Sequence, residues 1–181
     1  MNIFVLDRDP VIAAQLLCDA HVVKMILESC QLLSTHDTLT HRVADTSSMY
    51  KVTHSNHPCR VCLTNEGNRV WLKYHLNALL QEYTFRYGKI HKCSELVSQY
   101  WYTPLLWQLG TSSTALGQLQ LHIDAAVRQQ TLPKCMPEEF KTGGSDIISV
   151  VRSYRNYYKY KQQTMKRFRY TRRETPRWLS A

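Results

Sequence analysis

Apolar residues recur at helical spacing along most of the chain, and the alternation typical of strands is scarce. After an apolar stretch at 3–6, Asp9 and Pro10 have the form of an N-cap followed by proline, which predicts a helix. Asp19 caps a second helical segment, or marks a kink in a longer one, that continues through 21–35. Polar residues dominate 36–57, which predicts a long loop with a short helix near 49–52.

The second half of the chain repeats the same signals. Asn56, His57 and Pro58 predict the start of a long helix that reaches Gly88, with an interruption at Gly67. Further helices are predicted over 94–109, kinked near Pro104, and over 114–129. Ser145 or Asp146 caps a last helix over 147–168. The predicted fold is all-α, a single-domain compact helical bundle of residues 1–181 with a basic C-terminal helix and tail.

Length and composition favour one ordinary domain. The chain has 181 residues, of which 44% are hydrophobic and 20% charged. No apolar run approaches the roughly 20 residues of a membrane span, and the N-terminus is acidic where a signal peptide would be basic. We therefore expect a soluble protein inside a cell, without a membrane partner. Six cysteines in a chain of this size favour reduced thiols over a disulfide scaffold.

The positive charge is concentrated at one end. Residues 151–181 contain ten basic residues and one acidic residue, whereas residues 1–150 are neutral overall. Basic groups neutralise phosphates and aromatic rings stack on unpaired bases, so 151–181 is predicted to be a nucleic-acid-binding segment. Its candidate binding residues are Arg152, Arg155, Tyr157, Tyr158, Lys166, Arg167, Arg169, Arg172, Arg173 and Trp178. A solvated basic helix whose tyrosines pack on the core, or an acidic protein partner, would also fit.

Polar residues in the second segment share one predicted helix face. His21, Lys24 and Glu28, followed by Gln31 and Thr35, recur every three or four residues, opposite an apolar face of 22, 23, 26, 27, 30 and 33. An imidazole, an amine and a carboxylate within two turns supply a base, a nucleophile and a stabilising charge, as glycosidic-bond or Schiff-base chemistry requires. A solvated helix face is the alternative.

Histidines and cysteines cluster at the start of the predicted helix near 58. His54, His57, Cys59 and Cys62 have zinc-like spacing, but zinc sites need a further cluster, and Cys93 and Cys135 are remote in sequence. We expect no metal and no cofactor, although the sequence leaves metal binding by these four residues open. The P-loop, dinucleotide and zincin motifs are absent, which excludes nucleotide hydrolysis, Rossmann redox chemistry and zincin proteolysis. Asn56 or His57 is expected to cap the helix, and His57 could also face a phosphate.

Three sequence blocks resemble the pyrimidine-dimer DNA glycosylase/AP-lyase family of bacteriophages and bacteria. They are QLLCDAHVVKM, then SNHP opening a helix that ends in EYTFRYGKIHK, then the aromatic and basic C-terminus ending in TPRWLSA. The chain is also similar to bacteriophage proteins that begin MNIF-LD-DP and carry CDKHVVKM. The resemblance implies an all-α DNA-processing enzyme that acts on a damaged or modified base, in double-stranded DNA, within the cytoplasm of an infected host cell.

In that family the N-terminal amine attacks the sugar C1′ to form an imine, a glutamate assists, and arginines hold the damaged strand. The resemblance places Val22 and Val23 where the family has its arginine and its glutamate. Glu28 could replace the carboxylate if the helix is rotated or shifted. The nucleophile is then the amine of Met1, because Asn2 is too bulky for efficient methionine removal, or Lys24. The predicted catalytic residues are Met1, Asp7, Arg8, His21, Lys24 and Glu28.

Two other functions fit the same residues. The first is a non-catalytic nucleic-acid-binding module, or an inhibitor that sequesters a host factor. The second is a transferase that modifies DNA bases on the same scaffold. The sequence leaves the target base, the choice between DNA and RNA, and the oligomeric state open.

Overall fold

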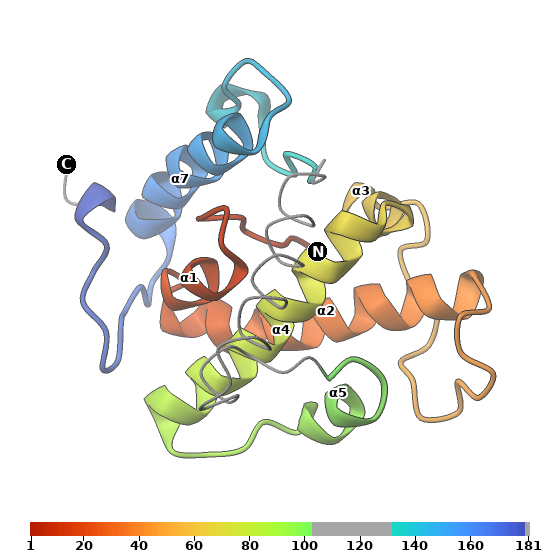
Figure 1. Ribbon diagram of the computed structural model, residues 1–181. Helices are drawn as coiled ribbons and strands as arrows, with labels where there is room; N and C mark the ends of the chain where they lie inside the picture. The colour runs from red at the N-terminus through yellow and green to blue at the C-terminus, as the bar shows by residue number, and fades with distance from the viewer. Residues whose placement is uncertain (103–131, 180–181) are drawn as a thin grey trace, which may run out of the picture.

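The computed structural model describes residues 1–102 and 132–179, which are helices and connecting loops with no strand among them. The all-α prediction is confirmed (Figure 1). In chain order the elements are α1 (Pro10–Gln15), α2 (Asp19–Leu39), α3 (Pro58–Val61), η1 (Cys62–Thr64), α4 (Glu66–Tyr87), α5 (Ser94–Tyr100), η3 (Glu138–Phe140), α7 (Ile147–Thr164) and η4 (Arg177–Leu179). None of the described helices is both long and apolar enough to cross a membrane.

Local signals determined several helix ends as the sequence predicts. The Asp9 side chain accepts hydrogen bonds from the backbone N–H groups of Val11 and Ile12 at the start of α1. Asp146 caps α7 in the same way through the N–H of Ser149. Helix α4 ends at Gly88, which adopts the left-handed conformation with φ of 65° that glycine tolerates best.

Other predicted boundaries are wrong, because side-chain contacts override them. The carboxylate of Asp19 bonds Arg86 and Thr171 instead of capping α2. Helix α2 continues to Leu39, because its last turns are buried, so the loop spans 40–57 and the short helix expected at 49–52 does not form. The interruption predicted at Gly67 does occur in the helix expected from Pro58 to Gly88, but it lies just before Gly67, because Asn65 caps α4 through the N–H of Asn68.

Helix α7 ends at Thr164, earlier than the predicted 168. Helix α5 confirms the start of the helix expected over 94–109. That helix ends at Tyr100, earlier than the predicted 109, while residues 103–109 and the helix expected over 114–129 lie outside the described residues.

The core forms where α1 and α2 pack on α4, and the N-terminal segment enters it (Figure 1). Residues 3–6 are buried between these helices and α7, whose Tyr154 and Tyr158 are also fully buried. The ring of Phe4 contacts both tyrosines, with centroid separations of 6.2 and 5.6 Å. The first residues of the chain are therefore structural, and their burial determines where the N-terminus lies.

A buried ion network joins α2, α4 and the C-terminal tail. Arg86 Nε donates to Glu82 Oε1 at 2.7 Å, and Arg86 Nη1 donates to Asp19 Oδ1 at 2.9 Å. Arg173, from the tail, makes a bidentate contact with Glu82 at 2.9 and 2.8 Å. Burial would raise the pKa of Asp19, but hydrogen bonds from Thr171 and Arg86 outweigh it, and the pKa is lowered. The network orders the tail against the helices.

We expect Glu82→Gln to destabilise the fold strongly, because Arg86 and Arg173 would lose the charge that they share. The free energy of unfolding should fall by about 3–5 kcal/mol in urea denaturation. Glu139→Gln, on the exposed surface of η3, should change it by less than about 0.5 kcal/mol. Equal denaturation midpoints for the two variants would contradict this role of the network.

The buried ring of His75 should make stability depend on pH. Burial lowers its pKa from 6.5 to about 4, although its hydrogen bond to the Pro10 carbonyl opposes the shift. Between these values the unfolded chain binds the proton more readily than the folded one, so stability is full above pH 6.5 and is lost as the pH falls. The loss from this residue reaches about 3 kcal/mol.

Denaturation of His75→Asn at several pH values checks this expectation. Asparagine keeps a donor toward the Pro10 carbonyl but does not titrate, so its stability should fall less steeply than that of the wild type below pH 6.5. His41→Asn, in the exposed loop after α2, should follow the wild-type slope. Parallel profiles for His75→Asn and wild type would refute the assignment.

Candidate functional site

The N-terminal segment is held in place by the side chain of Asn2. Its Oδ1 accepts the backbone N–H groups of Ile3 and Phe4 at 2.7 and 3.2 Å, and its Nδ2 donates to the Cys135 carbonyl at 2.7 Å. Phe4 has a positive φ of 53°, a conformation that costs about 1–2 kcal/mol for an L-residue. Stacking of its ring on His21 at 4.3 Å offsets that cost. The backbone around Asn2 is therefore held by the turn at Ile3 and Phe4 and by the contact with Cys135.

Glu28 lies directly beside this peptide. Its Oε2 accepts the backbone N–H of Asn2 at 2.9 Å, and its Oε1 lies 3.3 Å from Lys24 Nζ. Backbone bond lengths then place the Met1 α-amine within about 6.5 Å of the carboxylate. The Glu28 side chain is 12% exposed and the Lys24 side chain 65%. The structure thus brings Met1, Lys24 and Glu28 together.

His57 faces the same group. Burial lowers its pKa, and the positive charges of the N-terminus and of His54 lower it further, while Glu28 opposes them. The ring is therefore neutral at neutral pH, and its Nδ1 accepts the N–H of Cys59 at 3.1 Å as the cap of α3. The predicted capping role of His57 is confirmed. Its position adds an imidazole to the amine and the carboxylate.

His21 occupies the buried end of the polar face. The Tyr158 hydroxyl accepts the N–H of Cys18 at 2.8 Å and forms a second hydrogen bond with His21 Nδ1 at 2.9 Å. Burial first, and then the charges of Lys24 and Lys161, lower the pKa of His21 to about 4. His21 is therefore a neutral, buried residue whose ring stacks on the ring of Phe4.

The face that contains His21, Lys24 and Glu28 is mostly buried, and only Lys24 of the three is exposed. The alternative of a solvated face is therefore wrong. Val23, expected on the apolar face, is instead 41% exposed.

Asp7 and Arg8 line a different cavity. Asp7 Oδ2 accepts a hydrogen bond from Arg155 Nη2 at 3.2 Å, and Arg155 Nε donates to the Leu6 carbonyl at 2.9 Å. A cavity of about 450 Å³ opens here, and its lining includes Asp7, Arg8, Arg152, Arg155 and Trp178. No hydrogen bond or ion pair among the described residues joins Asp7 or Arg8 to Glu28. The sequence predicts one site for all six catalytic candidates, but the structure divides them. Met1, Lys24 and Glu28 form one group, called the amine site below, and Asp7 and Arg8 line the basic cavity.

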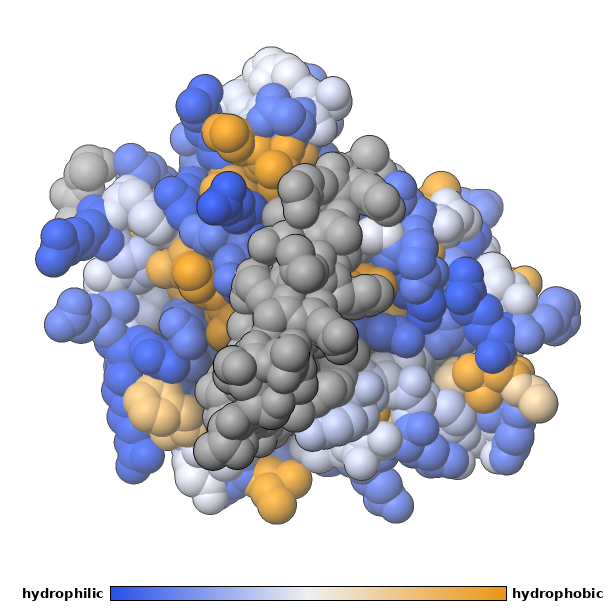
Figure 2. Space-filling model, viewed as in Figure 1, coloured by the Kyte–Doolittle hydropathy of each residue, from blue (hydrophilic) through white to orange (hydrophobic). Residues whose placement is uncertain are grey.

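Some of the basic residues near the C-terminus form ion pairs within the protein. Arg155 pairs with Asp7 and Arg173 with Glu82, so these two cations are tied to acids. Five predicted binding residues are exposed, Arg152, Lys166, Arg167, Arg169 and Arg172. In Figure 2 strongly hydrophilic side chains line the edge where the tail runs in Figure 1. The tail also bonds the start of α2, because Asp19 N donates to the Arg169 carbonyl at 2.8 Å.

Tyr158 and Tyr157 have different surroundings. Tyr158 is fully buried, so the prediction that it supports an unstacked base is wrong, and its hydroxyl instead serves Cys18 and His21. Tyr157 is half-buried and stacks between Phe4 at 6.1 Å and Tyr160 at 6.3 Å. Because Tyr160 is 44% exposed, these rings form a continuous aromatic path from His21 to the surface.

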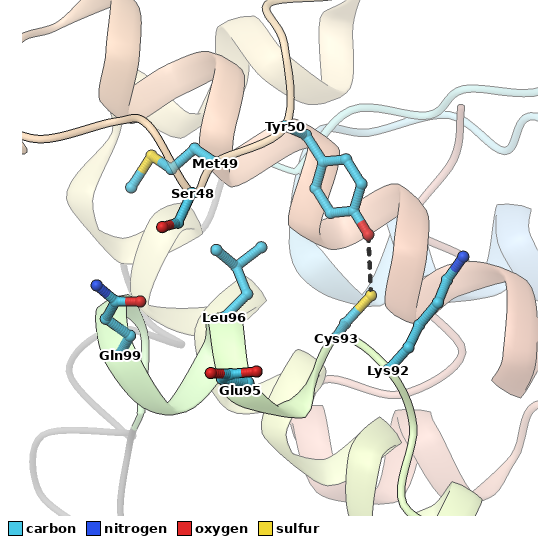
Figure 3. Close-up of a pocket in the computed structure, with 8 residues that line it drawn as sticks. All are labelled: Ser48, Met49, Tyr50, Lys92, Cys93, Glu95, Leu96 and Gln99. Atoms are coloured by element: carbon cyan, nitrogen blue, oxygen red, sulfur yellow. Dashed lines mark hydrogen bonds between the residues drawn. The ribbon is translucent and has the colours of Figure 1, made fainter.

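A further cavity of about 400 Å³ lies between the 40–57 loop and α5 (Figure 3). The hydroxyl of Tyr50 lies 3.3 Å from Cys93 Sγ at its edge. The hydrogen bond with the Cys30 thiol lowers the pKa of Cys93, although burial opposes the shift. Cys30 is two residues from Glu28 on α2, so this cavity lies on the opposite side of the helix from the amine. It contributes nothing to the amine site.

Several residues of the site carry no clear signal in the sequence. Asn2 positions the N-terminal segment because its side chain accepts the backbone N–H groups of Ile3 and Phe4. The tendency of asparagine to form such turns is the one sequence signal for this role. Cys135 contacts Asn2 and Cys59 although it lies 76 residues from the latter. The spacing of Glu82 and Arg86, four apart with the acid first, is the one pattern from which a part of the ion network could have been found.

Comparison with known proteins gives one match. The family model described as pyrimidine dimer DNA glycosylase matches residues 1–95, slightly more than half of the chain. That range contains Met1, Lys24, Glu28 and His57, and it ends before α7 and the basic tail. No curated protein and no solved structure matches the chain. The chain belongs to the pyrimidine dimer DNA glycosylase family.

Proposed function

We propose that this protein removes a damaged or modified base from double-stranded DNA, with the α-amine of Met1 as nucleophile. The amine forms a bond to the sugar C1′ while the glycosidic bond breaks, and the base leaves with the bonding electrons and takes up a proton. Opening of the sugar ring then gives an imine. The observation that carries this proposal is the 2.9 Å contact between Glu28 and the Asn2 N–H, which holds a carboxylate beside the N-terminus.

Glu28 is the acid–base group of this proposal. A carboxylate within about 6.5 Å of the amine can accept or return protons directly or through one water when DNA fills the space. The carboxylate also places a negative charge near the positive charge that develops at C1′. Lys24, paired with Glu28 and largely exposed, holds the carboxylate and faces the phosphates.

The exposed cations of the tail hold the DNA in this proposal. Arg152 and Trp178 border the 450 Å³ cavity, where Arg155 lies 5.2 Å from the Trp178 ring centroid. Trp178 Nε1 is buried and has no hydrogen-bond partner among residues 1–102 and 132–179. A nucleotide turned out of the helix fits the chemistry of this cavity, with a cationic rim for phosphate and an indole for the base. Tyr157 and Tyr160 offer a second stacking surface.

One observation favours binding without base removal as the second candidate. At the positions of the family's arginine and glutamate, Val22 is buried and Val23 is exposed, and neither carries a charge. A chain that lost its catalytic groups would keep the basic tail and its ordered contacts. Such a protein would bind DNA but would form no covalent intermediate.

Borohydride trapping on DNA that contains an abasic site tests the nucleophile. We expect a covalent protein–DNA adduct with the wild type and with Lys24→Ala, and none when the N-terminus is acetylated, because only the Met1 amine forms the imine. The intact mass of the purified protein establishes that Met1 is its first residue. Trapping that survives acetylation but disappears in Lys24→Ala would assign the nucleophile to Lys24. Absence of any adduct between about pH 6 and 8 would favour the binding protein.

The rate of base release from ultraviolet-irradiated DNA tests Glu28. We expect Glu28→Gln to lower this rate by about 10²–10⁴-fold, because the amide keeps the contact with Asn2 N–H but neither accepts nor returns a proton. Glu66→Gln, on the exposed start of α4, serves as the matched control and should keep the wild-type rate. Equal rates for the two variants would remove Glu28 from the mechanism.

Salt dependence of DNA binding tests the tail. We expect the double variant Arg167→Ala and Arg169→Ala to bind all sequences more weakly and to reduce the slope of log K against log salt by about two, one for each phosphate that is no longer neutralised. Lys51→Ala, in the exposed loop, should leave the slope unchanged. An unaltered slope in the double variant would place the DNA elsewhere.

A further inference from the structure

Three soft donors converge where α3 meets the segment before η3. One ring nitrogen of His57 and the sulfur atoms of Cys59 and Cys135 all lie within 4.8 Å of one another. The two sulfur atoms are 3.3 Å apart. This contact corrects the expectation that Cys135 is remote from the His57–Cys62 cluster. The structure provides the further ligand whose apparent absence argued against a metal.

The surrounding contacts hold these donors in place. His57 caps α3, and Pro58 occupies its first turn, so the local backbone is fixed. On the other side, Cys135 N donates to the Tyr154 hydroxyl at 3.3 Å, and the Cys135 carbonyl accepts from Asn2 at 2.7 Å. Cys59 is fully buried, and Tyr154 belongs to the core. The donors are therefore brought together by the fold before any ion arrives.

We propose that His57, Cys59 and Cys135 bind a zinc ion. Zinc takes thiolates at about 2.3 Å and imidazole at about 2.0–2.1 Å in a tetrahedron, which places two thiolates about 3.8 Å apart. The same geometry places thiolate and imidazole nitrogen about 3.5 Å apart, so the present donor separations need changes of up to about 1.3 Å. Cys62 is the neighbouring donor for the remaining position, because it lies one helical turn after Cys59 and its sulfur donates to the Cys59 carbonyl at 3.2 Å.

The donor set distinguishes zinc from the other occupants. Two thiolates and an imidazole suit zinc, whereas magnesium and calcium prefer oxygen ligands. A disulfide between Cys59 and Cys135 would leave the imidazole of His57 without a role in the cluster. A zinc ion uses all three groups and cross-links α3 to the segment that anchors Asn2, so it would stabilise the position of the N-terminus.

The wild-type protein provides the first test, after purification with a reductant and without chelators. We expect native mass spectrometry to find one zinc ion per chain. Replacement by cobalt should give the intense visible bands of a tetrahedral ion together with a thiolate-to-cobalt charge-transfer band. Weak octahedral bands without charge transfer would overturn the proposal, as would a metal-free chain or a Cys59–Cys135 disulfide that lowers the mass by two hydrogens.

Matched cysteine variants locate the site. We expect Cys59→Ala and Cys135→Ala each to weaken zinc affinity by about a hundredfold or more, since outer-shell changes alone cost about 10–100-fold. Cys30→Ala and Cys93→Ala, which alter the thiol pair on the other side of α2, should keep the wild-type affinity. Wild-type zinc affinity in Cys59→Ala and Cys135→Ala would overturn the proposal. These measurements involve no DNA, so they are independent of the glycosylase assignment.

Discussion

The hydrogen bond from the Asn2 peptide N–H to Glu28 is the contact on which the functional interpretation depends. It exists because residues 3–6 are buried among the helices, which leaves the chain end no freedom to move away from α2. The apolar burial of these residues outweighs the strained φ of Phe4, and the Asn2 side chain satisfies the backbone donors that the turn exposes. A terminal amine that is normally mobile is thereby fixed beside a carboxylate.

The basic C-terminus combines two roles that its composition alone does not separate. Arg155 holds α7 against Asp7 through a partly exposed pair, whereas Arg173 holds the tail against the buried carboxylate of Glu82, where the pair is expensive to break. The exposed arginines between them then lie on an ordered scaffold. A polycation attached in this way presents its charges at defined positions, as the proposed DNA contact requires.

The amine site and the proposed zinc site share one structural element. The Cys135 carbonyl receives the Asn2 side chain, while its sulfur contacts Cys59 at the start of α3. Groups from four separate parts of the chain therefore meet around the N-terminus. The proposed nucleophile and the proposed zinc ligands therefore depend on the same local packing.

Four features follow from local sequence: the all-α class, the capped starts of α1 and α7, the end of α4 at Gly88, and the basic and aromatic character of the last 31 residues. These features depend on local propensity and composition, which short stretches of chain carry alone. Other features emerge only in the folded chain: Glu28 meets the N-terminus, Tyr158 is buried, Arg173 is paired, and Cys135 contacts Cys59. Each of these depends on contacts between residues far apart in sequence, and helix periodicity specifies which face is buried but not what covers it.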